Sequence, residues 1–213
     1  MFIGNTEVFA IESEGLWRPQ PGLGYLLGNF RYWVAGKQYS RTDRDDLWLS
    51  GNMFKLRDLC EVYEPVEMPD LFDEDIMPVL SALAVSEWTS LLYDPDDEYT
   101  ERPAEAVDCY QPILRKYNRE QLLKQVLIPA PEMTDGDSIL GFIVCSGKVR
   151  VIAAKLADVE DANGEDELWS LNEISEVTIR WDEFYYLMNA AFEWLERCPV
   201  EIPDWFERRW TSG

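Results

Sequence analysis

The feature that most restricts the fold of this chain is an acidic stretch, Glu61 to Asp108, that encloses an apolar segment. The stretch holds 15 acidic residues against one basic residue, a net charge of −14. Inside it, residues 76–92 carry apolar side chains at roughly helical spacing, which predicts a helix with one buried side. Asp75 and Pro78 suit the first turn of that helix, where backbone N–H groups lack intrahelical partners. We therefore expect the stretch to be folded and largely helical, with carboxylates held around the helix.

The length and the apolar content indicate a globular protein. Of the 213 residues, 46% are hydrophobic and 13% are aromatic, which is far above the content of disordered chains. A chain of this length is typical of one domain, so we expect residues 1–213 to form a single domain.

The distribution of charge restricts the kinds of partner. The net charge is −22, and residues 158–213 form a second acidic block with 15 acidic residues against four basic ones. Such a surface repels phosphate groups, so neither nucleic acid nor an anionic membrane is expected as a partner. It favours a basic protein and accelerates the encounter with one. Solubility alone is the alternative explanation of the charge.

Strand patterns occur near both ends of the chain. Residues 7–12 and 25–34 read as strands separated by a loop over 15–24, and the turn Ala35-Gly36-Lys37 joins the second of them to Gln38-Tyr39 in a hairpin. A second hairpin is predicted from 139–145 and 149–154 around Ser146-Gly147. Here Val149 and Val151 alternate with Arg150, which indicates a sheet with one solvent-facing side.

A helix is expected after the last strand, which covers residues 177–181. Asp182 caps it, and its apolar stripe comprises Phe184, Leu187, Met188, Ala191 and Leu195. Residues 120–128 fit a helix or a buried strand equally well. Strands at both ends with helices between and after them predict an α+β fold: a mostly antiparallel sheet, built from the N- and C-terminal hairpins and strands, with helices packed on it.

Catalytic and cofactor motifs are missing from the sequence. The chain has no histidine, which excludes Ser-His-Asp and Cys-His catalysis and any zinc site that contains histidine. Its four cysteines lack paired spacing, and no glycine-rich phosphate loop follows a strand. We therefore expect no catalytic residue, cofactor or metal. With no secretory signal and no bilayer-length apolar run, the chain is expected to be cytoplasmic with reduced thiols.

Two N-terminal segments resemble a known family. These are Met-Phe-Ile-Gly-Asn-Thr-Glu-Val-Phe-Ala-Ile-Glu at 1–12 and Leu-Gly-Asn-Phe-Arg-Tyr-Trp-Val-Ala-Gly at 27–36. They are similar to the immunity protein 42 family of bacterial polymorphic toxin systems. The resemblance implies a non-catalytic cytoplasmic protein that binds and neutralises a cognate toxin. The charge of the chain favours a toxin with a basic cleft, such as a nuclease.

Two acidic loops are the expected contact sites for that toxin. The contact residues would be Asp94, Asp96, Asp97, Glu98 and Glu101 in the first loop, and Asp158, Glu160, Asp161, Glu165 and Asp166 in the second, 158–167. Nearby aromatic residues, namely Tyr93, Tyr99 or Trp169, could supply anchors. Two other functions stay open: a carboxylate-dependent hydrolase, and a nucleic-acid mimic that blocks a DNA-binding protein.

Overall fold

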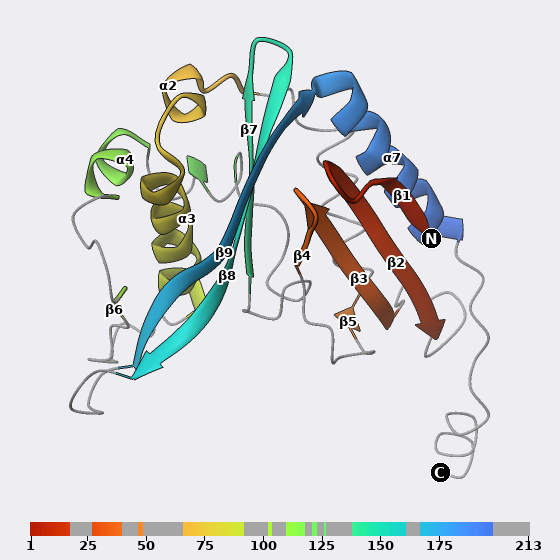
Figure 1. Cartoon of the computed structure of the whole chain (residues 1–213), viewed down its shortest axis with the longest axis horizontal. Helices are drawn as coiled ribbons and strands as arrows, with labels where there is room; N and C mark the ends of the chain where they lie inside the picture. The colour runs from red at the N-terminus through yellow and green to blue at the C-terminus, as the bar shows by residue number, and fades with distance from the viewer. Residues whose placement is uncertain are drawn as a thin grey trace. The chain divides into compact units, whose positions relative to one another are not determined.

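The strands form two sheets in the computed structural model, one from the N-terminal strands and one mainly from strands of the C-terminal half (Figure 1). The structure describes residues 1–17, 27–39, 47–48, 66–91, 102–103, 110–117, 121–122, 126, 138–160 and 167–197. The chain divides into two compact units. Unit 1 comprises Met1–Tyr63, Pro129–Asp135 and Asp182–Gly213, and unit 2 comprises Glu64–Ile128 and Gly136–Trp181. The α+β class is confirmed, and a single domain over residues 1–213 stays a prediction.

Unit 1 is built on a five-stranded antiparallel sheet. Its strands are β1 (Phe2–Asn5), β2 (Phe9–Trp17), β3 (Leu27–Val34), β4 (Lys37–Tyr39) and β5 (Leu47–Trp48). Their order is β1-β2-β3-β4, and β5 pairs with β3. The expected first strand is shifted, because the structure has a turn over 6–8 and β2 continues into the expected loop as far as Trp17. β1 was not predicted, because a short strand that contains a glycine carries a weak pattern.

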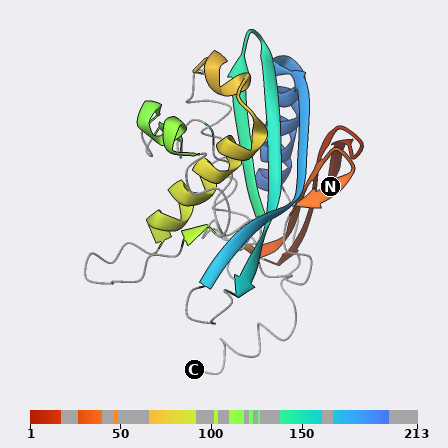
Figure 2. The same ribbon diagram turned by 60° about the vertical axis from the view of Figure 1, so that its left-hand side comes forward.

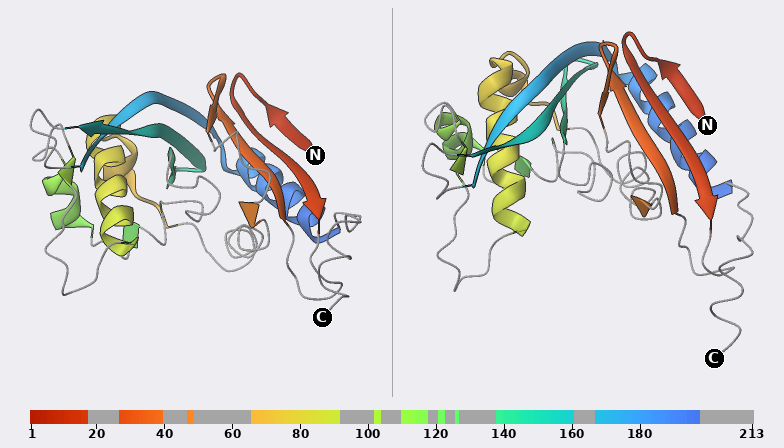
Figure 3. Two further views of the ribbon diagram at one scale, coloured as in Figure 1. Left: turned by 90° about the horizontal axis from the view of Figure 1, so that it is seen from below. Right: turned by 60° about the horizontal axis from the view of Figure 1, so that its bottom comes forward.

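One helix covers one face of this sheet. Helix α7 (Trp181–Arg197) lies along the sheet in Figure 3. The Phe184 ring of α7 stacks on Phe9 of β2 with centroids 6.0 Å apart, and Phe9 stacks in turn on Tyr32 of β3 at 6.1 Å. Burial raises the pKa of Tyr32 far above its ordinary value. The predicted stripe is confirmed where side chains are described, because Phe184, Leu187, Met188 and Ala191 are all buried.

Both predicted hairpins are confirmed, although the first turn is one residue shorter than expected because Lys37 begins β4. Val34 pairs with Lys37 across Ala35-Gly36, and Cys145 pairs with Lys148 across Ser146-Gly147. All four turn residues have positive φ, which a two-residue type I′ turn requires. Such turns match the twist of antiparallel strands, so they set the register of both hairpins.

Unit 2 is built on a four-stranded sheet in the order β6-β9-β8-β7. Its strands are β6 (Arg102–Pro103), β7 (Ser138–Cys145), β8 (Lys148–Glu160) and β9 (Glu167–Arg180). The β6–β9 pair is parallel and the others are antiparallel. Two backbone hydrogen bonds cover the outer edge of β7, from Met68 N to Val144 O and from Phe142 N to Val126 O. These bonds reduce the number of free backbone groups that the edge offers to other chains.

The acidic stretch supplies the helix that covers this sheet. Helix α3 (Ile76–Leu91) crosses one face of it in Figures 2 and 3, accompanied by α2 (Pro69–Phe72) and α4 (Gln111–Lys116). We expected one buried side, but all residues of 79–84 are buried, which covers every direction around the helix axis. α3 also packs tightly on β7, because a Cβ on Gly141 would lie 2.8 Å from Leu83 Cδ1. The exposed carboxylates therefore lie before α3 and not along its described part.

Candidate functional site

Most of the ten expected contact residues lie outside the part of the chain that the structure describes. This holds for Asp94, Asp96, Asp97, Glu98, Glu101, Asp161, Glu165 and Asp166. The backbones of Asp158 and Glu160 belong to β8, where they pair with Trp169 and Glu167 of β9. The expected loop over 158–167 is therefore corrected at both ends, because the hairpin strands run to Glu160 and restart at Glu167.

The described part of unit 2 displays a different group of carboxylates, which we call the acidic edge. It consists of exposed side chains on α2 and on the connection from α2 to α3, namely Asp70, Asp73, Glu74 and Asp75. Among the described lysines and arginines, none forms an ion pair with Asp73, Glu74 or Asp75. The sequence had placed these residues in the acidic block without assigning them to a site. Three consecutive acids before an apolar helix are the signal that could have identified them.

A buried arginine fixes the acidic edge to the sheet. Arg150 of β8 is only 5% exposed, although its alternation with valines predicted a solvent-facing position. Its Nη1 donates to the backbone oxygens of Phe72 and Glu74, at 2.9 and 2.6 Å, and more weakly to that of Leu71 at 3.4 Å. These bonds satisfy the last carbonyl groups of α2, which have no intrahelical donor, and one carbonyl group of the connection that follows. The carboxylates of the acidic edge therefore follow a backbone that is held in place.

A carboxylate on the neighbouring strand completes the environment of Arg150. Glu176 of β9 accepts hydrogen bonds from Arg150 Nε at 2.8 Å and from Nη2 at 3.1 Å. This two-pronged geometry is the one in which arginine binds carboxylates most strongly. All three guanidinium nitrogens of Arg150 thus have acceptors, so its buried charge is fully hydrogen-bonded, in part to the exposed carboxylate of Glu176.

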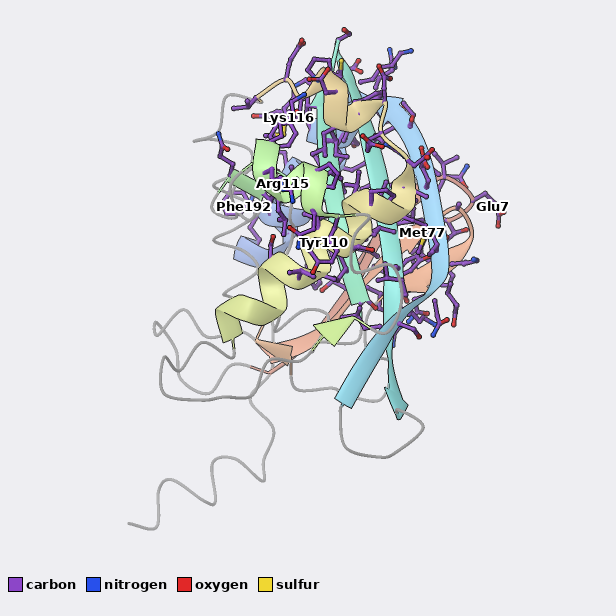
Figure 4. The ribbon with its side chains drawn as sticks, turned by 90° about the vertical axis from the view of Figure 1, so that its left-hand side faces the viewer. Glu7, Met77, Tyr110, Arg115, Lys116 and Phe192 are labelled. Carbon is purple, nitrogen blue, oxygen red and sulfur yellow. The ribbon has the colours of Figure 1, made fainter. Side chains whose placement is uncertain are left out.

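Helix α4 brings basic side chains next to one end of the acidic edge. Figure 4 shows Arg115 and Lys116 on this helix. Lys116 Nζ forms an ion pair with Asp70, and the hydrogen bond to Asp70 raises the pKa of Lys116. Both side chains are exposed, so this pair contributes little to stability. The charge of Asp70 is thus partly neutralised by Lys116. The negative charge of the acidic edge comes mainly from Asp73, Glu74 and Asp75.

Within the described ranges, no group of three or more Cys, Asp or Glu side chains is arranged to hold a metal ion. Among the helices that the structure describes, none is long and apolar enough to cross a bilayer. The exposed carboxylates of the acidic edge can contact a cationic surface.

The comparisons with known proteins agree with this architecture. The chain is similar in fold to a crystal structure of CdiI from Burkholderia dolosa AUO158, with a TM-score of 0.53 and 16% sequence identity. The superposition covers 91% of this chain and 99% of that one. No curated protein matches the sequence. The model of the family described as immunity protein 42 matches residues 1–194, so the chain belongs to the immunity protein 42 family.

Proposed function

We propose that this chain binds and neutralises a cognate bacterial toxin by covering a basic surface of that toxin. The observation that carries the proposal is membership of the immunity protein 42 family over residues 1–194. The solved CdiI structure, which is similar in fold to this chain, supports the same function. Protection of the producing cell requires the protein to meet the toxin inside that cell, so we place it in the cytoplasm.

Charge supports a basic partner. The chain carries a net charge of −22, and part of it comes from the acidic edge, whose backbone is held by Arg150 of the sheet. Toxins that cleave nucleic acids need a basic cleft for phosphate, and an acidic protein in that cleft blocks the substrate by shape and by charge. A nuclease is therefore the toxin class that we propose.

The proposed contacts come from the two acidic segments predicted from the sequence. They are Asp94, Asp96, Asp97, Glu98 and Glu101 in the first, and Asp158, Glu160, Asp161, Glu165 and Asp166 in the second. Acids in these positions would steer the toxin during the encounter, because clustered charge acts over about 10 Å at ordinary salt.

Co-expression with the toxin encoded beside this gene tests the proposal. The five acids of the first segment are changed to Asn or Gln, and a second variant changes the five acids of the second segment. A control with the same change in charge replaces Glu7, Asp43, Asp45, Asp46 and Asp58, which lie outside both acidic blocks. We expect the unaltered protein and the control to protect cells, and the two segment variants to lose toxin affinity by about tenfold or more.

The stoichiometry of protection separates binding from catalysis. A non-catalytic inhibitor protects only when it is present at least in amounts equivalent to the toxin. Full protection by a small fraction of an equivalent would indicate turnover and would favour a carboxylate-dependent hydrolase. Protection that survives neutralisation of both acidic segments together would refute the role assigned to them.

A further inference from the structure

The exposed side of α7 combines aromatic and acidic side chains in one stripe. Positions 182, 183, 186, 189 and 193 lie within about one third of the helix circumference, at spacings of three, four and seven residues from position 186. We call this the outer stripe of α7, which consists of Asp182, Glu183, Tyr186, Asn189 and Glu193. Its direction is opposite to the buried side chains Phe184, Leu187, Met188 and Ala191, so the stripe faces away from the sheet of unit 1.

Tyr186 lies at the centre of this stripe and is unusually accessible for an aromatic residue. It is 67% exposed, and the neighbouring Tyr185 is 40% exposed. Exposed tyrosines are enriched at the centres of protein interfaces, because a large rigid ring buries much area at a low entropic cost.

The side chains around Tyr186 are mostly acidic, and several of them form hydrogen bonds within α7. Asp182 and Glu183 precede it by one turn, and Asp182 Oδ1 accepts a hydrogen bond from Glu183 N at 3.0 Å. One turn to two turns further on, Asn189 Nδ2 donates to Glu193 Oε1 at 3.2 Å. Arg197 is 3.8 Å from the Glu193 carboxylate, at the far end of the stripe. An aromatic centre flanked by carboxylates on both sides complements a partner with an apolar pocket between basic side chains.

We propose that the outer stripe of α7 is a docking surface for the cognate toxin, with Tyr186 as its anchor. The proposal rests on the proposed function for the identity of the partner. The charge of the stripe argues against other occupants: a second copy of this chain would bring like charges together, and nucleic acid or an anionic membrane would be repelled. A basic protein surface is the occupant that the stripe complements.

Binding of the purified toxin domain encoded beside this gene tests the anchor. Tyr186→Ala is compared with Phe2→Ala, a matched control because Phe2 is an aromatic residue of unit 1 that is 54% exposed on β1. We expect Tyr186→Ala to weaken binding by about 30-fold or more, the size of an interface hot spot, and Phe2→Ala to change it by less than about threefold. Far-UV circular dichroism and the melting temperature confirm that both variants are folded.

A charge variant and hydrogen exchange provide independent readings of the same surface. Glu193→Gln should slow association several-fold, whereas Glu7→Gln, an exposed acid of unit 1 that Figure 4 labels, should not. Amide exchange in α7 should slow when the toxin is bound. If the Tyr186→Ala variant still binds the toxin, or if Phe2→Ala weakens binding equally, this inference is wrong but the proposed function is not affected. Failure of the unaltered protein to bind the toxin overturns the proposed function as well.

Discussion

At the scale of single residues, Arg150 shows why an alternating pattern can mislead. The pattern Val149, Arg150, Val151 predicts a solvent-facing arginine, yet all three residues are buried. The acceptors of Arg150 lie 76 to 79 residues away, on α2 and the connection after it, and 26 residues away on β9. Nothing near Arg150 in the sequence encodes these partners, so its burial could not be predicted from local pattern.

Replacing Arg150 should destabilise unit 2 more than replacing an exposed arginine. Arg150→Met leaves the Glu176 carboxylate and the carbonyl groups of Phe72 and Glu74 without their donor. We expect a loss of about 2–4 kcal/mol in the free energy of unfolding, measured by urea denaturation. Arg115→Met, an exposed position on α4, serves as the control and should change stability by less than about 0.5 kcal/mol. Equal effects of the two substitutions would contradict the role given to Arg150.

The burial of Tyr32 makes a prediction about alkaline pH. Because burial raises its pKa in the folded state, the unfolded chain loses this proton first as the pH rises. The contribution of protonated Tyr32 to the free energy of unfolding is therefore full below about pH 10. Above that pH it declines by up to about 1.4 kcal/mol per pH unit. Urea denaturation between pH 9 and pH 11 should show a smaller decline for Tyr32→Phe than for the unaltered protein. Parallel declines would show that Tyr32 does not contribute.

At the scale of elements, the parts encoded by local sequence were predicted and the parts encoded by distant contacts were not. The turns at Ala35-Gly36 and Ser146-Gly147 and the apolar stripe of α7 follow from two-residue and helical spacing, and the structure confirms them. The helical character of α3 was predicted, but its burial in all directions depends on β7, α4 and their neighbours. The outer stripe of α7 was missed because the sequence does not show which exposed aromatic residues remain uncovered.

The first hairpin turn offers a stabilising substitution. Ala35 has φ of +50°, a left-handed conformation that an alanine adopts at a cost and that asparagine tolerates. Ala35→Asn creates the Asn-Gly pair preferred in type I′ turns, so we expect about 0.5–1 kcal/mol of added stability. Gly36→Ala, at φ of +79°, should instead destabilise by about 1 kcal/mol or more. Thermal unfolding of the two variants checks the opposite signs, and a loss of stability in Ala35→Asn would contradict the turn assignment.

At the scale of the whole molecule, family membership supports a toxin as the partner, and the net charge supports a basic one. Residues 1–12 and 27–36 indicated the family, which the match over residues 1–194 confirms, whereas the basic partner expected from the net charge of −22 stays a prediction. The positions of carboxylates could be predicted only as blocks, because which acids face a partner depends on packing. The acidic edge illustrates this, since its four carboxylates lie together through the contacts of α2 with Arg150.

The association rate constant of the unaltered protein with its toxin, measured from low to high salt, tests the central claim most directly. If acidic surfaces meet a basic toxin, the rate constant should fall by about tenfold or more between about 20 mM and 500 mM salt, while the dissociation rate changes less. A rate constant that stays the same across this range would contradict the claim that opposite charges bring the two proteins together.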